Sequence, residues 1–142
     1  MIWRFFRVLG LGRSDDVWTR GERAAERLLR RQRYRLLGRN VRTAIGEVDL
    51  LFEAPDGRTI VIVEVKARVV GPADHQRLPE RAVTPAKARK LVSLAQALAR
   101  KHRWTDRPMR IDVVAVEFAA GSRKPGAIRH HVGAIDADAR RA

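Results

Sequence analysis

Two apolar runs in the middle of the chain alternate with polar positions in a way that is typical of β-strands. The runs span residues 46–52 and 59–67, are rich in Val, Ile, Leu and Phe, and are separated by the turn-forming triplet Pro55-Asp56-Gly57. The pattern therefore predicts a β-hairpin. A two-residue turn at Asp56-Gly57 would pair Pro55 with Arg58 and, counting outwards, Asp49 with Glu64.

This register separates an apolar face of the hairpin from a charged one. The apolar face pairs Phe52 with Val61, Leu50 with Val63 and Val48 with Val65, whereas the other face pairs Leu51 with Ile62, Asp49 with Glu64 and Glu47 with Lys66. Two carboxylates opposed across a ladder repel each other, and burying either one alone costs several kcal/mol. A divalent cation between Asp49 and Glu64, with Lys66 one step along the face, would turn this repulsion into a binding site.

Helices are predicted on both sides of the hairpin. Asp15 or Asp16 can cap a helix that runs to about Arg33, and Thr84-Pro85 begins a second helix that runs to about His102. Tyr34–Leu37 is predicted as a short strand followed by a loop to Ala44. These elements indicate an α/β (α+β) domain in which helices flank a central mixed β-sheet.

The C-terminal third adds a last core strand and a shorter one. Met109–Phe118 alternates like a buried strand, with Asp112 on one face and Arg110, two residues earlier, as its expected structural partner. Ala127–Val132 is predicted as a short strand before a loose polar tail. With 142 residues the chain fits one domain, which we divide into an N-terminal extension (1–16), the main domain (17–120) and a C-terminal segment (121–142).

The N-terminal extension is apolar and carries Arg4 and Arg7. It is too short to span a bilayer and lacks a cleavage site, so it is not interpreted as a signal peptide. Such an end more often frays or packs on its own domain. The alternative is that it contacts a membrane or a partner protein.

The charge balance favours a polyanionic partner. Lys and Arg number 30 against 16 Asp and Glu, a net charge of +14, which favours nucleic acid first and an anionic membrane second; a general drift in composition towards Arg is the alternative explanation. Cysteine is absent, which excludes disulfides and thiolate metal sites and fits a reducing cytoplasm. The four His residues lack metal-ligand spacing, so a zinc site is not expected.

An ordered set of polar motifs resembles the PD-(D/E)XK nuclease superfamily, the restriction-endonuclease-like fold. The set comprises Gly21-Glu22, Arg39-Asn40-x-Arg42, Gly46-Glu47-Val48-Asp49-Leu50, Val63-Glu64-Val65-Lys66-Ala67-Arg68, Lys87 and Arg110-Ile111-Asp112-Val113-Val114. Within that superfamily it looks like the uncharacterised bacterial YraN-like family, which is similar in layout to archaeal Holliday-junction resolvases. The resemblance covers residues 20–118.

The resemblance implies a metal-dependent endonuclease that acts on nucleic acid, with DNA, including branched DNA, as the expected substrate. Asp49, Glu64 and the Val65 carbonyl oxygen would hold Mg²⁺, with Mn²⁺ as a substitute and with Glu22 as a supplementary ligand to the metal or its water. Lys66 would orient or deprotonate the attacking water. Cutting two strands of a junction would usually require a homodimer.

The resemblance also assigns Arg39, Arg42, Arg68 and Lys87 to contacts with nucleic acid. Residue by residue there are plainer explanations: Glu22 could pair with a neighbouring Arg, Arg39 and Arg42 could lie in a solvated loop, and Lys87 could belong to a solvated helix flank. For the whole chain, the alternative function is a catalytically inactive nucleic-acid-binding module of the same fold. An interaction factor that uses the N-terminal extension is a third reading.

Overall fold

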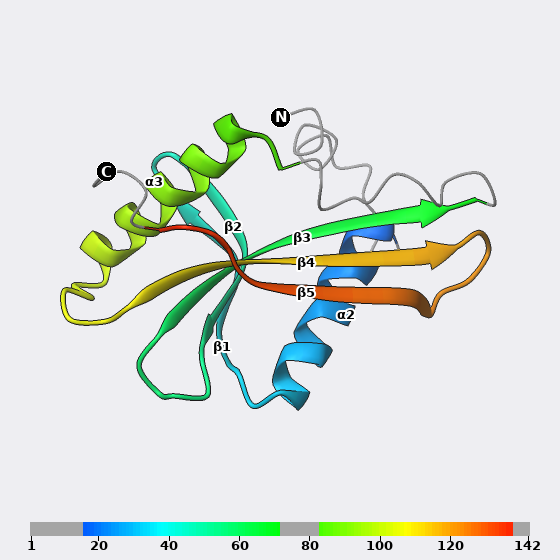
Figure 1. Cartoon of the computed structure of the whole chain (residues 1–142), viewed down its shortest axis with the longest axis horizontal. Helices are drawn as coiled ribbons and strands as arrows, with labels where there is room; N and C mark the ends of the chain where they lie inside the picture. The colour runs from blue at the N-terminus through cyan, green and yellow to red at the C-terminus, as the bar shows by residue number, and fades with distance from the viewer. Residues whose placement is uncertain (1–15, 72–82, 138–142) are drawn as a thin grey trace.

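The computed structural model describes residues 16–71 and 83–137. The elements in chain order are α2 (Val17–Arg31), β1 (Arg35–Thr43), β2 (Gly46–Glu53), β3 (Ile60–Val70), α3 (Pro85–Lys101), β4 (Met109–Ala119) and β5 (Pro125–Ile135). The five strands form one sheet in the order β1-β2-β3-β4-β5, with β3 and β4 parallel and the other pairs antiparallel. The predicted single α+β domain with a mixed sheet is therefore confirmed (Figure 1).

Both helices begin at the residues that the sequence indicates. The Asp16 side chain accepts a hydrogen bond from the Thr19 N–H at 2.7 Å, and the Thr84 hydroxyl accepts one from the Lys87 N–H at 3.2 Å. Each bond satisfies a main-chain donor that the first helical turn leaves unpaired. Pro85 follows Thr84 at a position where its missing N–H costs nothing.

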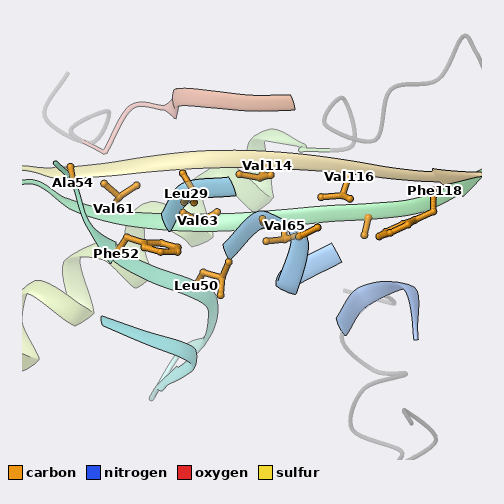
Figure 2. Close-up of a cluster of buried hydrophobic side chains, with 13 residues drawn as sticks. Leu29, Leu50, Phe52, Ala54, Val61, Val63, Val65, Val114, Val116 and Phe118 are labelled. Atoms are coloured by element: carbon orange, nitrogen blue, oxygen red, sulfur yellow. The ribbon is translucent and has the colours of Figure 1, made fainter. Parts of the chain in front are cut away.

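The sheet is covered by one helix on each face. Beneath α2, the core contains Leu29 and the buried side chains of the strands, drawn in Figure 2: Leu50, Phe52, Val61, Val63, Val65, Val114, Val116 and Phe118. Beneath α3, Leu91, Leu94 and Leu98 pack on Leu51, Ile60, Ile62 and Ile111. Helix α3 therefore covers the start of β3 and β4, and the later halves of both strands extend beyond the helix (Figure 1).

The predicted register of the hairpin is correct over four pairs, but its turn is not the predicted one. Leu50 pairs with Val63, and the pairing continues in step to Glu53 and Ile60. The Ala54 N–H donates to the Thr59 carbonyl, so the loop has four residues, 55–58, instead of two. Asp56 stabilises this loop because hydrogen bonds from the Thr59 hydroxyl and from the N–H groups of Thr59 and Arg58 lower the pKa of its carboxyl group to about 2.

The predicted pairing of the charged residues at the other end of the hairpin is wrong. The β2–β3 ladder ends at the pair Leu50–Val63, so Asp49 is not paired with Glu64, nor Val48 with Val65, nor Glu47 with Lys66. Val48 packs in the core beneath α3, whereas Leu50 packs beneath α2. The strict alternation that the prediction assumed is lost at this point because the two strands separate.

The two edge strands are longer than predicted. Strand β1 covers Arg35–Thr43, where a strand at Tyr34–Leu37 and a loop were expected, and β5 covers Pro125–Ile135 instead of Ala127–Val132. An edge strand is only partly buried and tolerates polar residues, which hides its pattern in the sequence. The N-terminal extension lies outside the described residues, except for Asp16.

Helix α2 lies very close to β3 at Gly21, where an added Cβ atom would clash with the Cβ of Ala67. We expect Gly21→Ala to lower the free energy of unfolding by about 1–3 kcal/mol, because the helix must move away from the sheet. Urea denaturation measures this change. Gly126→Ala is the control, since its added Cβ would be 3.7 Å from its nearest neighbour. Equal stability of Gly21→Ala and the wild type would contradict the close contact.

Candidate metal and nucleic-acid site

Asp49 lies at the point where β2 and β3 separate. Its side chain is 8% exposed, and its Oδ2 atom accepts a hydrogen bond from the Val65 N–H at 2.9 Å. This nitrogen belongs to the peptide bond between Glu64 and Val65, so the carboxylate of Asp49 lies beside the main chain of Glu64. The two predicted acids are therefore neighbours, although they are not a cross-strand pair.

Glu64 and Lys66 lie on the α3 side of β3, as alternation from Ile60 and Ile62 requires. The Lys66 Nζ is 3.2 Å from Glu64 Oε1, and the two side chains are only 12% and 18% exposed. A partly buried ion pair of this kind is screened less by water than a surface pair. It fixes the ammonium group of Lys66 next to the carboxylate of Glu64.

Lys87 extends from the first turn of α3 towards the same place. Burial and the positive charge of Lys66 lower the pKa of the Lys87 ammonium group, while the carboxylate of Glu64 acts in the opposite direction. The charge of Lys66 therefore acts directly on the ammonium group of Lys87. Two ammonium groups held this close repel each other, and an anion such as a phosphate would relieve that repulsion.

The carboxylates of Asp49 and Glu64, together with the Val65 carbonyl oxygen, are hard oxygen ligands that suit Mg²⁺ or Mn²⁺. Mg²⁺ is often bound by one or two carboxylates while other positions remain for water and substrate, so these residues fit such an ion. Among residues 16–71 and 83–137, no group of three or more His, Cys, Asp or Glu side chains is arranged to hold a metal. The role of Glu22 as a supplementary ligand to the metal or its water stays a prediction.

The four predicted nucleic-acid contacts fall in different places. Lys87 reaches the site, and Arg68 lies two residues beyond Lys66 on the same side of β3. Arg42 is 88% exposed and lies 3.7 Å from Glu47 in the β1–β2 hairpin. Arg39 is directed to the opposite face, where its guanidinium group binds both carboxylate oxygens of Glu26 on α2. Arg39 points to that face because it pairs with Leu50, whose side chain lies on the α2 side of the sheet.

A buried network around Asp112 contains His130, which the sequence pattern does not predict as a partner. Asp112 is 0% exposed and accepts hydrogen bonds from Arg110, as predicted, and also from the Gly133 N–H, with His130 Nε2 at 2.7 Å. Burial opposes ionisation, but these hydrogen bonds outweigh it and hold the pKa of Asp112 below its usual range. The sequence signal for this network is an isolated Asp in an apolar strand. Its partner on β5 cannot be identified from the sequence, because it depends on how β4 and β5 are paired.

The fold and this cluster define a single-domain α+β protein with two acids and two lysines gathered beside a central strand. The family model described as "Uncharacterised protein family UPF0102" matches residues 21–116. A UPF0102 protein of Anaeromyxobacter dehalogenans is 39% identical over 120 residues, 84% of either chain. One of Geobacter metallireducens is 41% identical over 106 residues, 75% of this chain and 83% of its own. The chain belongs to the UPF0102 family.

Neither described helix is long and apolar enough to span a membrane.

Proposed function

We propose that this protein is a metal-dependent nuclease that hydrolyses phosphodiester bonds, with DNA as the first candidate substrate. The observation that carries the proposal is the gathering of Asp49, Glu64, Lys66 and Lys87 at the end of the β2–β3 ladder. Oxygen ligands for a divalent cation and cations for a phosphate group then lie side by side. The net charge of +14 supports a polyanionic substrate.

Each side chain has a distinct part in this proposal. Asp49, Glu64 and the Val65 carbonyl would hold Mg²⁺, which when bound supplies Lewis-acid activation of water and phosphate. The ion pair with Glu64 orients Lys66, so that its ammonium group can position the attacking water and stabilise negative charge on the phosphate in the transition state. Lys87 would bind a second phosphate oxygen. Glu22 would be the supplementary ligand to the metal or its water.

The test is cleavage of a labelled panel of nucleic acids by the wild type and by Asp49→Ala. The panel contains duplex, single-stranded, flap and four-way-junction DNA, and RNA, each with Mg²⁺, Mn²⁺ or EDTA. We expect products only from the wild type and only with metal, because Asp49→Ala removes a carboxylate ligand. The substrate that is cut fastest identifies the preferred shape.

Contamination is the main alternative source of products, and the matched variant excludes it, since both proteins pass through the same purification. Equal cleavage by Asp49→Ala would contradict the proposed site. If no substrate is cut but the wild type still retards the panel in a gel, the protein binds nucleic acid without cleaving it.

A further inference from the structure

Strands β4 and β5 continue the surface on which Glu64 and Lys66 lie. Side chains that are paired across a ladder point to the same face of a sheet. The two registers align three rows across β3, β4 and β5: Glu64–Val113–His131, Lys66–Ala115–Arg129 and Arg68–Glu117–Ala127. The alternate residues Val114, Val116 and Ile128 pack under α2, so these rows lie on the other face of the sheet.

Small, buried side chains lie in the middle of the first two rows, and cations lie beside them. Val113 and Ala115 on β4 have short side chains that are 2% and 0% exposed. Long side chains flank them: Lys66 and Arg68 on β3, and Arg129 on β5. Two strand spacings separate β3 from β5, a distance of about 10 Å.

A groove opens at one end of these rows. It has a volume of about 760 Å³ and is lined by Val113 and His131 of the first row and by Thr84, Pro85 and Ala88 at the start of α3. Lys87 belongs to the same helical turn, and Glu64 pairs with Val113 in the β3–β4 ladder. The groove therefore lies next to the candidate site.

Glu117 holds the two arginines of the surface in place. Its Oε1 atom lies 3.5 Å from Arg68 Nη2 on one side and accepts a hydrogen bond from Arg129 Nη2 on the other. The Arg68 and Arg129 side chains remain 21% and 31% exposed, and the three residues together carry a net charge of +1. Guanidinium groups have five N–H donors in a planar fork that matches phosphate oxygens, and both of these side chains are partly exposed.

We propose that Arg129 and Arg68, oriented by Glu117, bind the phosphodiester backbone of a nucleic-acid strand that crosses β4 beside the candidate site. This inference rests on the proposed function, which places the phosphate to be cleaved at Glu64 and Lys66. A phosphate further along the same strand then lies against Arg129. The ligand class is the sugar–phosphate backbone, so the contact is independent of base sequence. Glu117 is a positioning residue.

Binding is measured in EDTA, where no metal-dependent cleavage occurs, with labelled duplex and single-stranded DNA over a series of salt concentrations. We expect Arg129→Ala to weaken binding about tenfold and to reduce the slope of log K against log salt by about one unit, because one phosphate contact is lost. Arg58→Ala removes the same charge from the exposed hairpin loop at the opposite end of β3 and should leave the slope unchanged. Arg129→Lys keeps the charge but loses the fork, so an intermediate affinity is expected.

The Glu117→Gln variant tests whether Glu117 orients Arg68 and Arg129 or acts only through its negative charge. Removing a negative charge should strengthen DNA binding if Glu117 only repels phosphate. If it orients the two arginines, binding should weaken by about threefold to tenfold despite the favourable change in charge, the range expected where a charge-assisted hydrogen bond is lost. Thermal unfolding of each variant shows whether the fold is intact.

The outcomes distinguish this inference from the proposed nuclease function. A wild type that binds but never cuts, together with weak binding by Arg129→Ala, supports the backbone contact and contradicts the nuclease. Wild-type affinity and salt slope in Arg129→Ala would overturn the contact, whether or not the wild type cuts. Absence of any DNA binding by the folded wild type would overturn it as well.

Discussion

Replacing Lys66 with alanine is expected to lower the rate of phosphodiester cleavage by about 10²- to 10⁴-fold, the range typical of losing a positioned acid–base group. The Lys66 Nζ lies 3.2 Å from Glu64 Oε1 and the Lys66 side chain is 12% exposed, so the ammonium group is held beside the Glu64 carboxylate instead of moving freely in solvent. Binding of nucleic acid should remain largely intact, because the other cations of the surface are unchanged. Single-turnover cleavage with Mg²⁺ and gel retardation in EDTA measure the two effects separately.

Lys101→Ala is the matched control for this variant. Lys101 is the last residue of α3 and is exposed, whereas Lys87 is in the first turn, so the helix separates them by about 20 Å. The control removes the same charge and should cut at the wild-type rate. If Lys66→Ala also cuts at that rate, Lys66 has no part in the mechanism.

The second large effect concerns stability. Asp112→Ala should lower the free energy of unfolding by about 3 kcal/mol, because it removes a buried carboxylate and leaves Arg110 and His130 without their shared partner. The effect belongs at the lower end of the range for buried pairs, since the Arg110 side chain is 27% exposed and can regain water. Urea denaturation at neutral pH measures it. Asp106→Ala, at an exposed site whose carboxylate binds the Thr105 hydroxyl, should change stability by less than about 0.5 kcal/mol.

The same network predicts how stability depends on pH. The pKa of Asp112 is lower in the folded protein than the value of about 3.9 expected in the unfolded chain, so ionised Asp112 favours folding. Its contribution is complete above about pH 5 and is lost as the pH falls through the lower folded-state pKa. Between pH 5 and pH 3 the wild type should therefore lose more stability than Asp112→Asn. Parallel curves for the two proteins would contradict this role of Asp112.

Much of the fold follows from local patterns, because helix caps and alternating strands are local properties. Asp16, Thr84 and the register at Leu50–Val63 were predicted for this reason. The predicted pairing of Asp49 with Glu64 failed because strand separation is a property of the whole sheet, which no short window of sequence contains. The acids still lie together, through a hydrogen bond from the Val65 main-chain N–H to the Asp49 carboxylate that alternation cannot predict.

Contacts between distant segments account for the remaining differences. Arg39 binds Glu26, thirteen residues earlier, because β1 places it on the face that α2 covers. His130 reaches Asp112, eighteen residues earlier, only because β5 pairs with β4 and is irregular near Gly133. A partner for Asp112 could be expected from its apolar surroundings, but the choice of His130 depends on that irregularity.

The position of β3 at the centre of the sheet has a consequence for how a substrate is selected. Strand β3 pairs with β4 along its whole length, from Ile60 to Val70, so Glu64 and Lys66 cannot move without breaking that ladder. Their main-chain amide protons should accordingly exchange with solvent only when the whole domain unfolds. Such a rigid site cannot adapt its shape to a regular duplex, so for the proposed nuclease the cost of fitting falls on the nucleic acid. Sites where DNA is already bent, frayed or branched are the least costly to deform, and they are the substrates that a rigid strand would favour.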